Sequence, residues 1–391
     1  MRLAAFIRAN IESISVEWER LPTHGMLVPG TENPAGLSPD GAFLTGYAAC
    51  STSAVSFSFR SVQVIRPDNR HPLLVPLAQA QEAVTRLETS AEGASPAVAE
   101  GLRARMAYRE AAGWLSYAHV LIHPHDLALR DRGLTGSYGA AFLSGRLEAQ
   151  IPATAAREFG FESAPSDIVA GQALRMAQLW RRLAELRTWR PVADADAVHE
   201  TLQSLGCRPA RAAAEIEDWL VTVDRAPGPL LIRAGCAARD WMNRPGVDPR
   251  GNDGLFLAAS LWCRQGAGRP IALPFWSAPE PRHDRLALRV GLPWMAGFLD
   301  CVAAAAKVGL DELARLRQAE DKSHLLGRTA RSRLPAAVAA VLRAPIVTAR
   351  DLAQELDVTP QAALGLLRQL AEAGIVREAT GRASWRAFVL A

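Results

Sequence analysis

The chain has 391 residues, of which 49% are hydrophobic and 21% charged, and its formal net charge is +4. This length suits two or three domains, each with its own core. The small net charge excludes a polybasic protein that coats nucleic acid with its whole surface. No apolar run reaches the length of a transmembrane helix, and charged residues interrupt the N-terminus too early for a signal peptide, so we expect no membrane partner.

The cysteines have no metal-ligand spacing and are odd in number, which favours free thiols in a reducing cytoplasm. They are Cys50, Cys207, Cys236, Cys263 and Cys301. Neither a metal nor a cofactor is expected, and the predicted location is cytoplasmic.

Residues 1–72 mix prolines and glycines with a Ser/Thr-rich run, and they predict a poorly ordered leader. Residues 73–226 show helical periodicity and predict a first helical domain. Its expected helices span 78–87, 97–118, 140–149, 166–189, 194–205 and 215–223. A Pro-Gly-Pro linker at 227–229 begins a second helical domain, 227–326. Its expected helices span 230–241, 255–263, 285–290, 294–306 and 310–325.

Two histidines stand in the run His123-Pro124-His125-Asp126. A His-x-His pair alone supplies too few ligands for a closed metal site. The run instead predicts a turn, with Asp126 or Thr135 as the cap of the helices that follow. No metal is expected there.

A glycine-rich loop between two apolar helices is a candidate anion-binding site, because free N–H groups at a helix N-terminus hold anions. Its candidate residues are Arg250, Gly251, Asn252 and Gly254. In position and flanks this loop resembles the signature loop of Fic-type proteins. The histidine and arginine positions of that motif fall on Gly246 and Gly254. The resemblance therefore implies at most a degenerate Fic-like scaffold, because no imidazole is present to accept a hydroxyl proton.

Phe275 and Trp276 lie in a proline-rich loop, which we expect to fold onto the helical body. Walker-type, GxGxxG and paired-carboxylate signatures are missing from the sequence. We therefore expect no catalytic residue and no enzyme.

The last segment, 327–391, predicts a winged helix–turn–helix domain. A first helix is expected over 331–343, and a short one over 349–356, capped by Thr348. Thr359-Pro360 begins a third helix, 360–373, and Gly374 ends it. Strands are expected over 375–378 and 383–389, joined by a basic turn.

Shape and charge of this segment both suggest double-stranded DNA as the partner. A helix with glutamine and arginine on its outer face fits the major groove, and arginines of the wing suit phosphates. The candidate DNA-binding residues are Thr359, Gln361, Ala362, Gly365, Arg368, Gln369, Arg382 and Arg386. Nine arginines and five acidic residues fall within 327–391, so this segment alone has the +4 charge of the whole chain.

The runs 352–363, 367–370 and 381–386 resemble bacterial winged helix–turn–helix domains. Together with 120–138, they resemble an uncharacterised, often plasmid-borne alphaproteobacterial family that pairs a helical domain of unknown function with a C-terminal HTH DNA-binding domain. The expected fold is mainly α, a multi-helix body with a C-terminal winged domain. The expected function is a transcriptional regulator, with a homodimer and a small-molecule effector as further expectations. A Fic-like nucleotide-binding or AMP-transfer protein and an interaction module of a plasmid maintenance or transfer system remain the alternatives.

Overall fold

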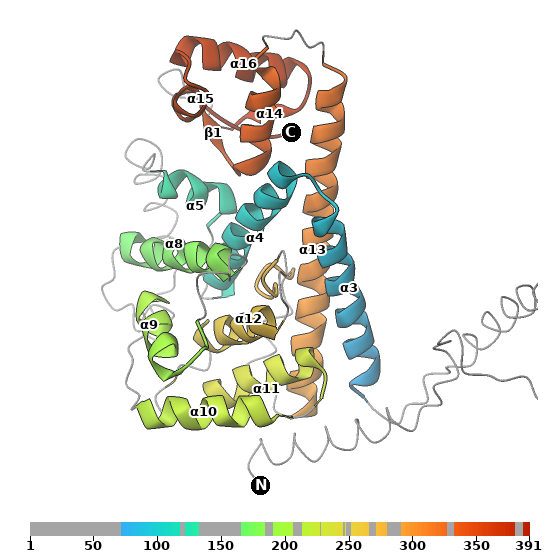
Figure 1. Cartoon of the computed structure of the whole chain (residues 1–391), viewed down its shortest axis with the longest axis vertical. Coiled ribbons are helices and arrows are strands. Elements are labelled where there is room, and N and C mark those ends of the chain that lie inside the picture. Colours follow the sequence, from blue (N-terminus) through green and yellow to red (C-terminus); the bar gives the residue numbers. More distant parts are fainter. Residues whose placement is uncertain are drawn as a thin grey trace, which may run out of the picture.

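The computed structural model describes residues 72–117, 122–132, 166–183, 191–205, 213–226, 228–244, 247, 252–265, 271–279, 291–326, 332–379 and 386–391. The predicted leader before residue 72 and the helices predicted at 140–149 and 285–290 lie outside these ranges. The predicted fold class is confirmed: a multi-helix body is followed by a C-terminal helix–turn–helix domain with a small sheet (Figure 1). Among the described helices, none is long and apolar enough to span a bilayer.

The body is built from helices in both segments that were predicted as separate units. They are α3 Leu74–Glu92, α4 Pro96–Tyr117, α5 Pro124–Asp131, α8 Ser166–Leu183, α9 Ala195–Leu205, α10 Ala213–Arg225, α11 Leu230–Met242, α12 Asp253–Gln265 and α13 Leu292–His324. One cluster of buried apolar residues runs from α3 through α13 and into the C-terminal domain. The predicted boundary between two helical domains at residue 226 stays a prediction.

The longest helix, α13, runs most of the height of the molecule and packs along α3 (Figure 1). A break near residue 309 was predicted, and this was wrong, because α13 continues as one helix of 33 residues. Gly309 explains the difference. A Cβ on it would lie 2.8 Å from Cδ2 of Leu87 in α3, so the glycine lets the two helices approach closely.

A smaller buried cluster joins α9, α10, α11 and α12. Its centre is an edge-to-face pair formed by Trp219 and Trp241, whose ring centroids are 5.2 Å apart. Each indole N–H has a buried partner: Trp219 donates to the carbonyl of Ala237 at 3.1 Å and Trp241 to Oδ2 of Asp253 at 2.9 Å. Satisfied donors of this kind let tryptophan fill a core without an unpaired polar atom.

The loop 271–279 lies on the body as predicted, with Phe275 2% and Trp276 4% exposed. The fully buried carboxylate of Glu110 in α4 holds it there. This carboxylate accepts the backbone N–H groups of Phe275, Trp276 and Ser277 at 2.7–3.1 Å, together with the Ser277 hydroxyl. Gly113, also in α4, leaves room for the loop, because a Cβ there would lie 1.9 Å from the Trp276 carbonyl oxygen.

The described residues of the C-terminal domain form three helices and a three-stranded sheet. The elements are α14 Leu334–Arg343, β1 Val347–Thr348, α15 Ala349–Leu356, α16 Pro360–Glu372, β2 Val376–Glu378 and β3 Ala387–Leu390. The strand order is β1-β3-β2, with both pairings antiparallel; Val347 pairs with Phe388 and Val376 with Leu390. The first strand was not predicted, because two residues after a proline show no alternation, and only pairing with β3 makes them a strand.

Candidate nucleic-acid interface

Local capping signals build the helix–turn–helix. The Thr348 hydroxyl accepts the Asp351 N–H at 3.2 Å, and the Asp351 carboxylate accepts the Thr348 N–H at 3.3 Å, so a capping box begins α15. Asp357 ends α15 in the left-handed region, with φ 52°. The Thr359 hydroxyl then accepts the Ala362 N–H at 3.2 Å, with Pro360 at the first helical position of α16. The caps predicted at residues 348 and 359 are thus confirmed.

The two faces of α16 differ in burial as its sequence pattern predicts. Ala363, Leu367 and Leu370 are buried against α14, α15 and β2. The opposite face is open, and its exposed residues are Thr359, Gln361, Ala362, Arg368 and Gln369. Gly365 lies among them, and a Cβ added there would meet no atom within 4 Å. The open face therefore offers short side chains and hydrogen-bonding groups to a partner, as major-groove docking requires.

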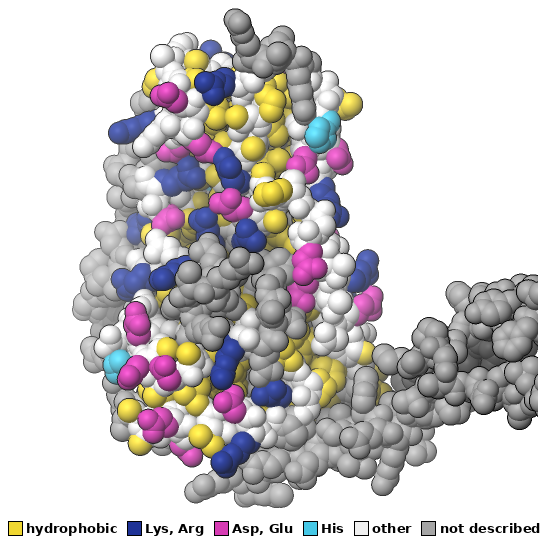
Figure 2. All heavy atoms as spheres, in the orientation of Figure 1, with side chains coloured by type: hydrophobic (Ala, Val, Ile, Leu, Met, Phe, Trp, Pro, Cys, Tyr) yellow, Lys and Arg dark blue, Asp and Glu magenta, His cyan; other side chains and the backbone are white. Residues whose placement is uncertain are grey.

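The two remaining DNA-binding candidates come after α16 in the chain, and the structure describes only one of them. Arg382 lies outside the described residues. Arg386 directly precedes β3 and is 3.8 Å from the carboxylate of Glu378 on β2, with its side chain 37% exposed. On the same domain Arg350 and Arg377 are exposed. Figure 2 shows basic side chains interspersed with acidic ones below this domain, where it meets the body.

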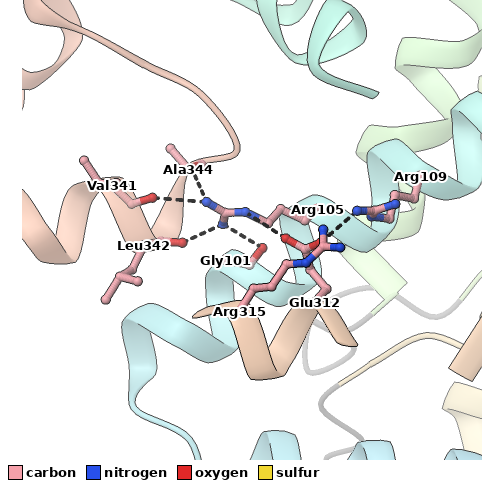
Figure 3. Close-up of polar contacts among 8 residues, drawn as sticks. All are labelled: Gly101, Arg105, Arg109, Glu312, Arg315, Val341, Leu342 and Ala344. Carbon is pink, nitrogen blue, oxygen red and sulfur yellow. Dashed lines mark hydrogen bonds and ion pairs between the residues drawn. The ribbon is translucent and has the colours of Figure 1, made fainter. Parts of the chain in front are cut away.

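A buried arginine of the body fixes the C-terminal domain in place. Arg105 of α4 is 6% exposed. Its guanidinium donates to the carbonyls of Leu342 at 2.6 Å, Ala344 at 2.8 Å and Val341 at 3.2 Å (Figure 3). These carbonyls belong to the end of α14, where carbonyl groups lack helical partners and a cation is favoured. Burial lowers the pKa of Arg105 to about 10, so it remains charged at neutral pH.

A carboxylate of α13 completes this joint. Glu312 is buried and lies 3.4 Å from Nε of Arg105, 2.8 Å from Arg109 and 3.8 Å from Arg315 (Figure 3). Gly101 permits the close approach of α4 and α14, since a Cβ on it would lie 1.9 Å from the Leu342 carbonyl oxygen. Sequence reasoning missed Arg105 and Glu312; the only local signal is two arginines four residues apart on an alanine-rich helix.

A second link joins the body directly to the helix–turn–helix. Arg132, just after α5, lies 2.7 Å from the Asp351 carboxylate in α15. Both side chains are about one-third exposed, at 31% and 34%. This pair contributes about 1 kcal/mol or less. This pair joins the body to the helix that precedes α16.

The candidate anion loop is described in part. Arg250 and Gly251 lie outside the described residues. Asn252 is 5% exposed, and its amide nitrogen lies 3.0 Å from the Met176 sulfur. A Cβ on Gly254 would lie 2.8 Å from Cγ of Met242. Both described residues thus pack between helices, and anion binding at this loop stays a prediction.

The turn before α5 has a different cap from the one predicted. His123, not Asp126, is the N-cap, and its Nδ1 accepts the His125 N–H at 3.2 Å. Asp126 lies in the first turn of α5, where an acidic side chain is favoured by the helix dipole. Within the described ranges, no group of three or more histidine, cysteine or acidic residues is placed to hold a metal ion.

A match to a family model agrees with this geometry. Residues 334–390 match the family model described as "HTH DNA binding domain". The chain is 39% identical over 87 residues to the uncharacterized protein y4cF of Sinorhizobium fredii, covering 22% of each chain. It is 30% identical over 173 residues to the harmonin-binding protein USHBP1 of Rattus norvegicus, covering 44% of this chain and 23% of that one.

The chain thus spans less than a quarter of these relatives' lengths. The family match begins at the first residue of α14 and ends at the last residue of β3. The chain therefore ends in a helix–turn–helix DNA-binding domain.

Proposed function

We propose that this protein is a sequence-specific DNA-binding regulator that reads the major groove with the open face of α16. The exposed side chains on that face carry the proposal, together with the empty space around Gly365. Gln361, Arg368 and Gln369 have the hydrogen-bonding groups that recognise base edges. Arg382 and Arg386 contact phosphates in this proposal, and such contacts supply affinity without sequence preference.

The helical body has a supporting role in this proposal. One helix–turn–helix module forms a small interface with DNA, and dimers usually bind two half-sites one helical turn apart. The body would supply the dimer contact and respond to a small-molecule effector in the cytoplasm. Selection of bound fragments from genomic DNA, followed by mobility shifts at several salt concentrations, tests the proposal. A steep loss of affinity with salt supports it, because released counterions mark phosphate contacts.

Arg368→Ala is expected to weaken binding to the selected site by about 1–3 kcal/mol and to relax the preference at one base pair. The physical reason is the loss of a guanidinium that donates two hydrogen bonds to one base. Arg86→Ala on α3, whose side chain is 68% exposed, is the matched control and should leave binding unchanged. Unchanged affinity and base preference in Arg368→Ala would remove this residue from the readout.

Gly365→Glu is expected to abolish specific DNA binding and to leave the fold intact. No atom lies within 4 Å of the Cβ position, so the new side chain fits the free protein. In the complex it would place a negative charge between α16 and the groove. Gly365→Ala is the control, expected to fold and to gain about 1 kcal/mol of stability from higher helix propensity. Thermal melts and mobility shifts of both variants separate the two effects, and a Gly365→Glu protein that binds like the parent contradicts the docking face.

A further inference from the structure

A cavity of about 320 Å³ lies between the helical body and the DNA-binding domain. This volume is at the lower end of the range for small-molecule sites. Its lining comes from α4, α5 and α13 on one side and from the C-terminal domain on the other. The lining residues are Arg105, Tyr108, Arg109, His123, Pro124, His125, Glu312, Arg315, Pro345, Arg377, Leu390 and Ala391.

Positive charge dominates this cavity. Four arginine side chains line it with one acidic side chain, Glu312, which is already shared among Arg105, Arg109 and Arg315. Three positive charges therefore remain in excess among these side chains. A cavity with uncompensated guanidinium groups favours an anionic ligand, since planar guanidinium groups bind phosphate and carboxylate oxygens in pairs of hydrogen bonds.

Two of these arginines stand at the solvent-facing side of the cavity and come from different domains. Arg315 of α13 has a side chain 64% exposed, and Arg377 of β2 is exposed as well. Within the described part of the chain, the guanidinium of Arg377 makes no hydrogen bond or ion pair. Arg105 is unlike them, because its guanidinium is occupied by the α14 carbonyls.

The two histidines of the cavity are neutral hydrogen-bonding groups. Burial, the neighbouring His123 and the arginines Arg105 and Arg377 lower the pKa of His125 to about 4. Burial also lowers the pKa of His123, against the opposing effect of Asp126. At neutral pH each uncharged ring therefore has one N–H donor and one acceptor nitrogen. The Tyr108 hydroxyl donates to Asp131, so the tyrosine offers mainly its ring to the cavity.

We propose that this cavity binds a compact oxyanion with two or more negative charges, a phosphate or carboxylate compound, and that its occupancy alters DNA binding. The expected effect on DNA binding rests on the proposed function. The ligand would bridge Arg315 and Arg109 of the body to Arg377 of the DNA-binding domain. Because β2 follows α16 after Gly374, a ligand held by Arg377 acts on the strand next to the groove-reading helix.

The direct test is calorimetric titration of the full chain with pyrophosphate and with citrate at constant ionic strength. Saturable binding with one ligand per chain is expected. Arg377→Gln and Arg315→Gln should each weaken it roughly tenfold or more, because each removes a charged hydrogen-bond donor. Both side chains are exposed, so the fold should be retained, and thermal melts check this. Arg175→Gln, an exposed arginine of α8 outside the cavity, is the matched control.

Two results overturn the anion site: no saturable binding of either anion, or an equal loss of affinity in Arg175→Gln. The link to DNA is tested by mobility shifts with and without pyrophosphate at the same ionic strength. A change in DNA affinity that disappears in Arg377→Gln supports the link, since coupling between two sites is reciprocal. No change in DNA affinity at saturating pyrophosphate contradicts it.

The two proposals fail in different ways. Arg368→Ala should lose DNA affinity and keep its anion affinity, because Arg368 does not line the cavity. If the full chain binds pyrophosphate but no DNA sequence, the proposed function fails and the anion site stands. If it binds a specific sequence but neither anion, the anion site fails and the proposed function stands.

Discussion

Arg105→Met is expected to destabilise the protein by about 3–5 kcal/mol, the cost of removing one partner from a buried ion pair. Methionine fills a similar volume but donates no hydrogen bond. The carbonyls of Val341, Leu342 and Ala344 would lose their partner, and Glu312 would lose one of its three cations. The variant should therefore unfold at lower denaturant concentration, and its C-terminal domain should separate from the body before the body unfolds.

Urea unfolding, monitored by circular dichroism, measures the loss of stability. Hydrogen exchange of the α14 amides shows whether the loss occurs at this joint. Arg103→Met is the control, since Arg103 is half-buried two residues earlier on the same helix and does not contact α14 by any hydrogen bond in the described residues. An Arg105→Met protein as stable as Arg103→Met would show that the joint does not depend on this guanidinium.

Glu110→Gln is expected to cost about 1–3 kcal/mol, because one backbone N–H group of a buried loop, that of Trp276 or that of Ser277, would lose its acceptor. Both carboxylate oxygens of Glu110 accept hydrogen bonds, and an amide keeps only one of them as an acceptor. The NH₂ group would face the Trp276 N–H or the N–H and hydroxyl of Ser277, whereas the Phe275 N–H would keep the remaining oxygen. The loop should then detach from α4.

Tryptophan fluorescence reports this detachment, because Trp276 is 4% exposed in the intact protein. Denaturant melts give the change in the free energy of unfolding. Glu100→Gln on the same helix, with its carboxylate 45% exposed, serves as the control for loss of a charge alone. If Glu110→Gln and Glu100→Gln have equal stability and equal emission, the carboxylate is not what holds the loop.

The helix–turn–helix could be predicted from sequence because its signals are local. Thr348, Thr359-Pro360 and Gly374 mark helix ends through contacts within a few residues, and the structure confirms all three. The outward face of α16 followed from helical periodicity alone. By contrast, the Asp126 cap was wrong because α5 begins earlier, with Pro124 at its first position, so that His123 is the N-cap and Asp126 lies in the first turn.

Only the tertiary structure shows what joins the C-terminal domain to the helical body. Arg105 and Leu342 are separated by 237 positions in sequence, and no periodicity connects an arginine in one helix to the carbonyls at the end of another. Separate helices were predicted over 294–306 and 310–325, yet α13 continues as one helix in which Gly309 packs against Leu87. β1 likewise exists only through its pairing with β3.

The sequence by itself therefore determined the helix–turn–helix, its outward-facing residues and its concentration of positive charge, since each depends on neighbours in the chain. The tertiary structure decided how that domain is fixed to the helical body and that four arginines meet around one cavity. Those features arise from contacts between residues far apart in sequence, which depend on the packing of whole helices rather than on local preference.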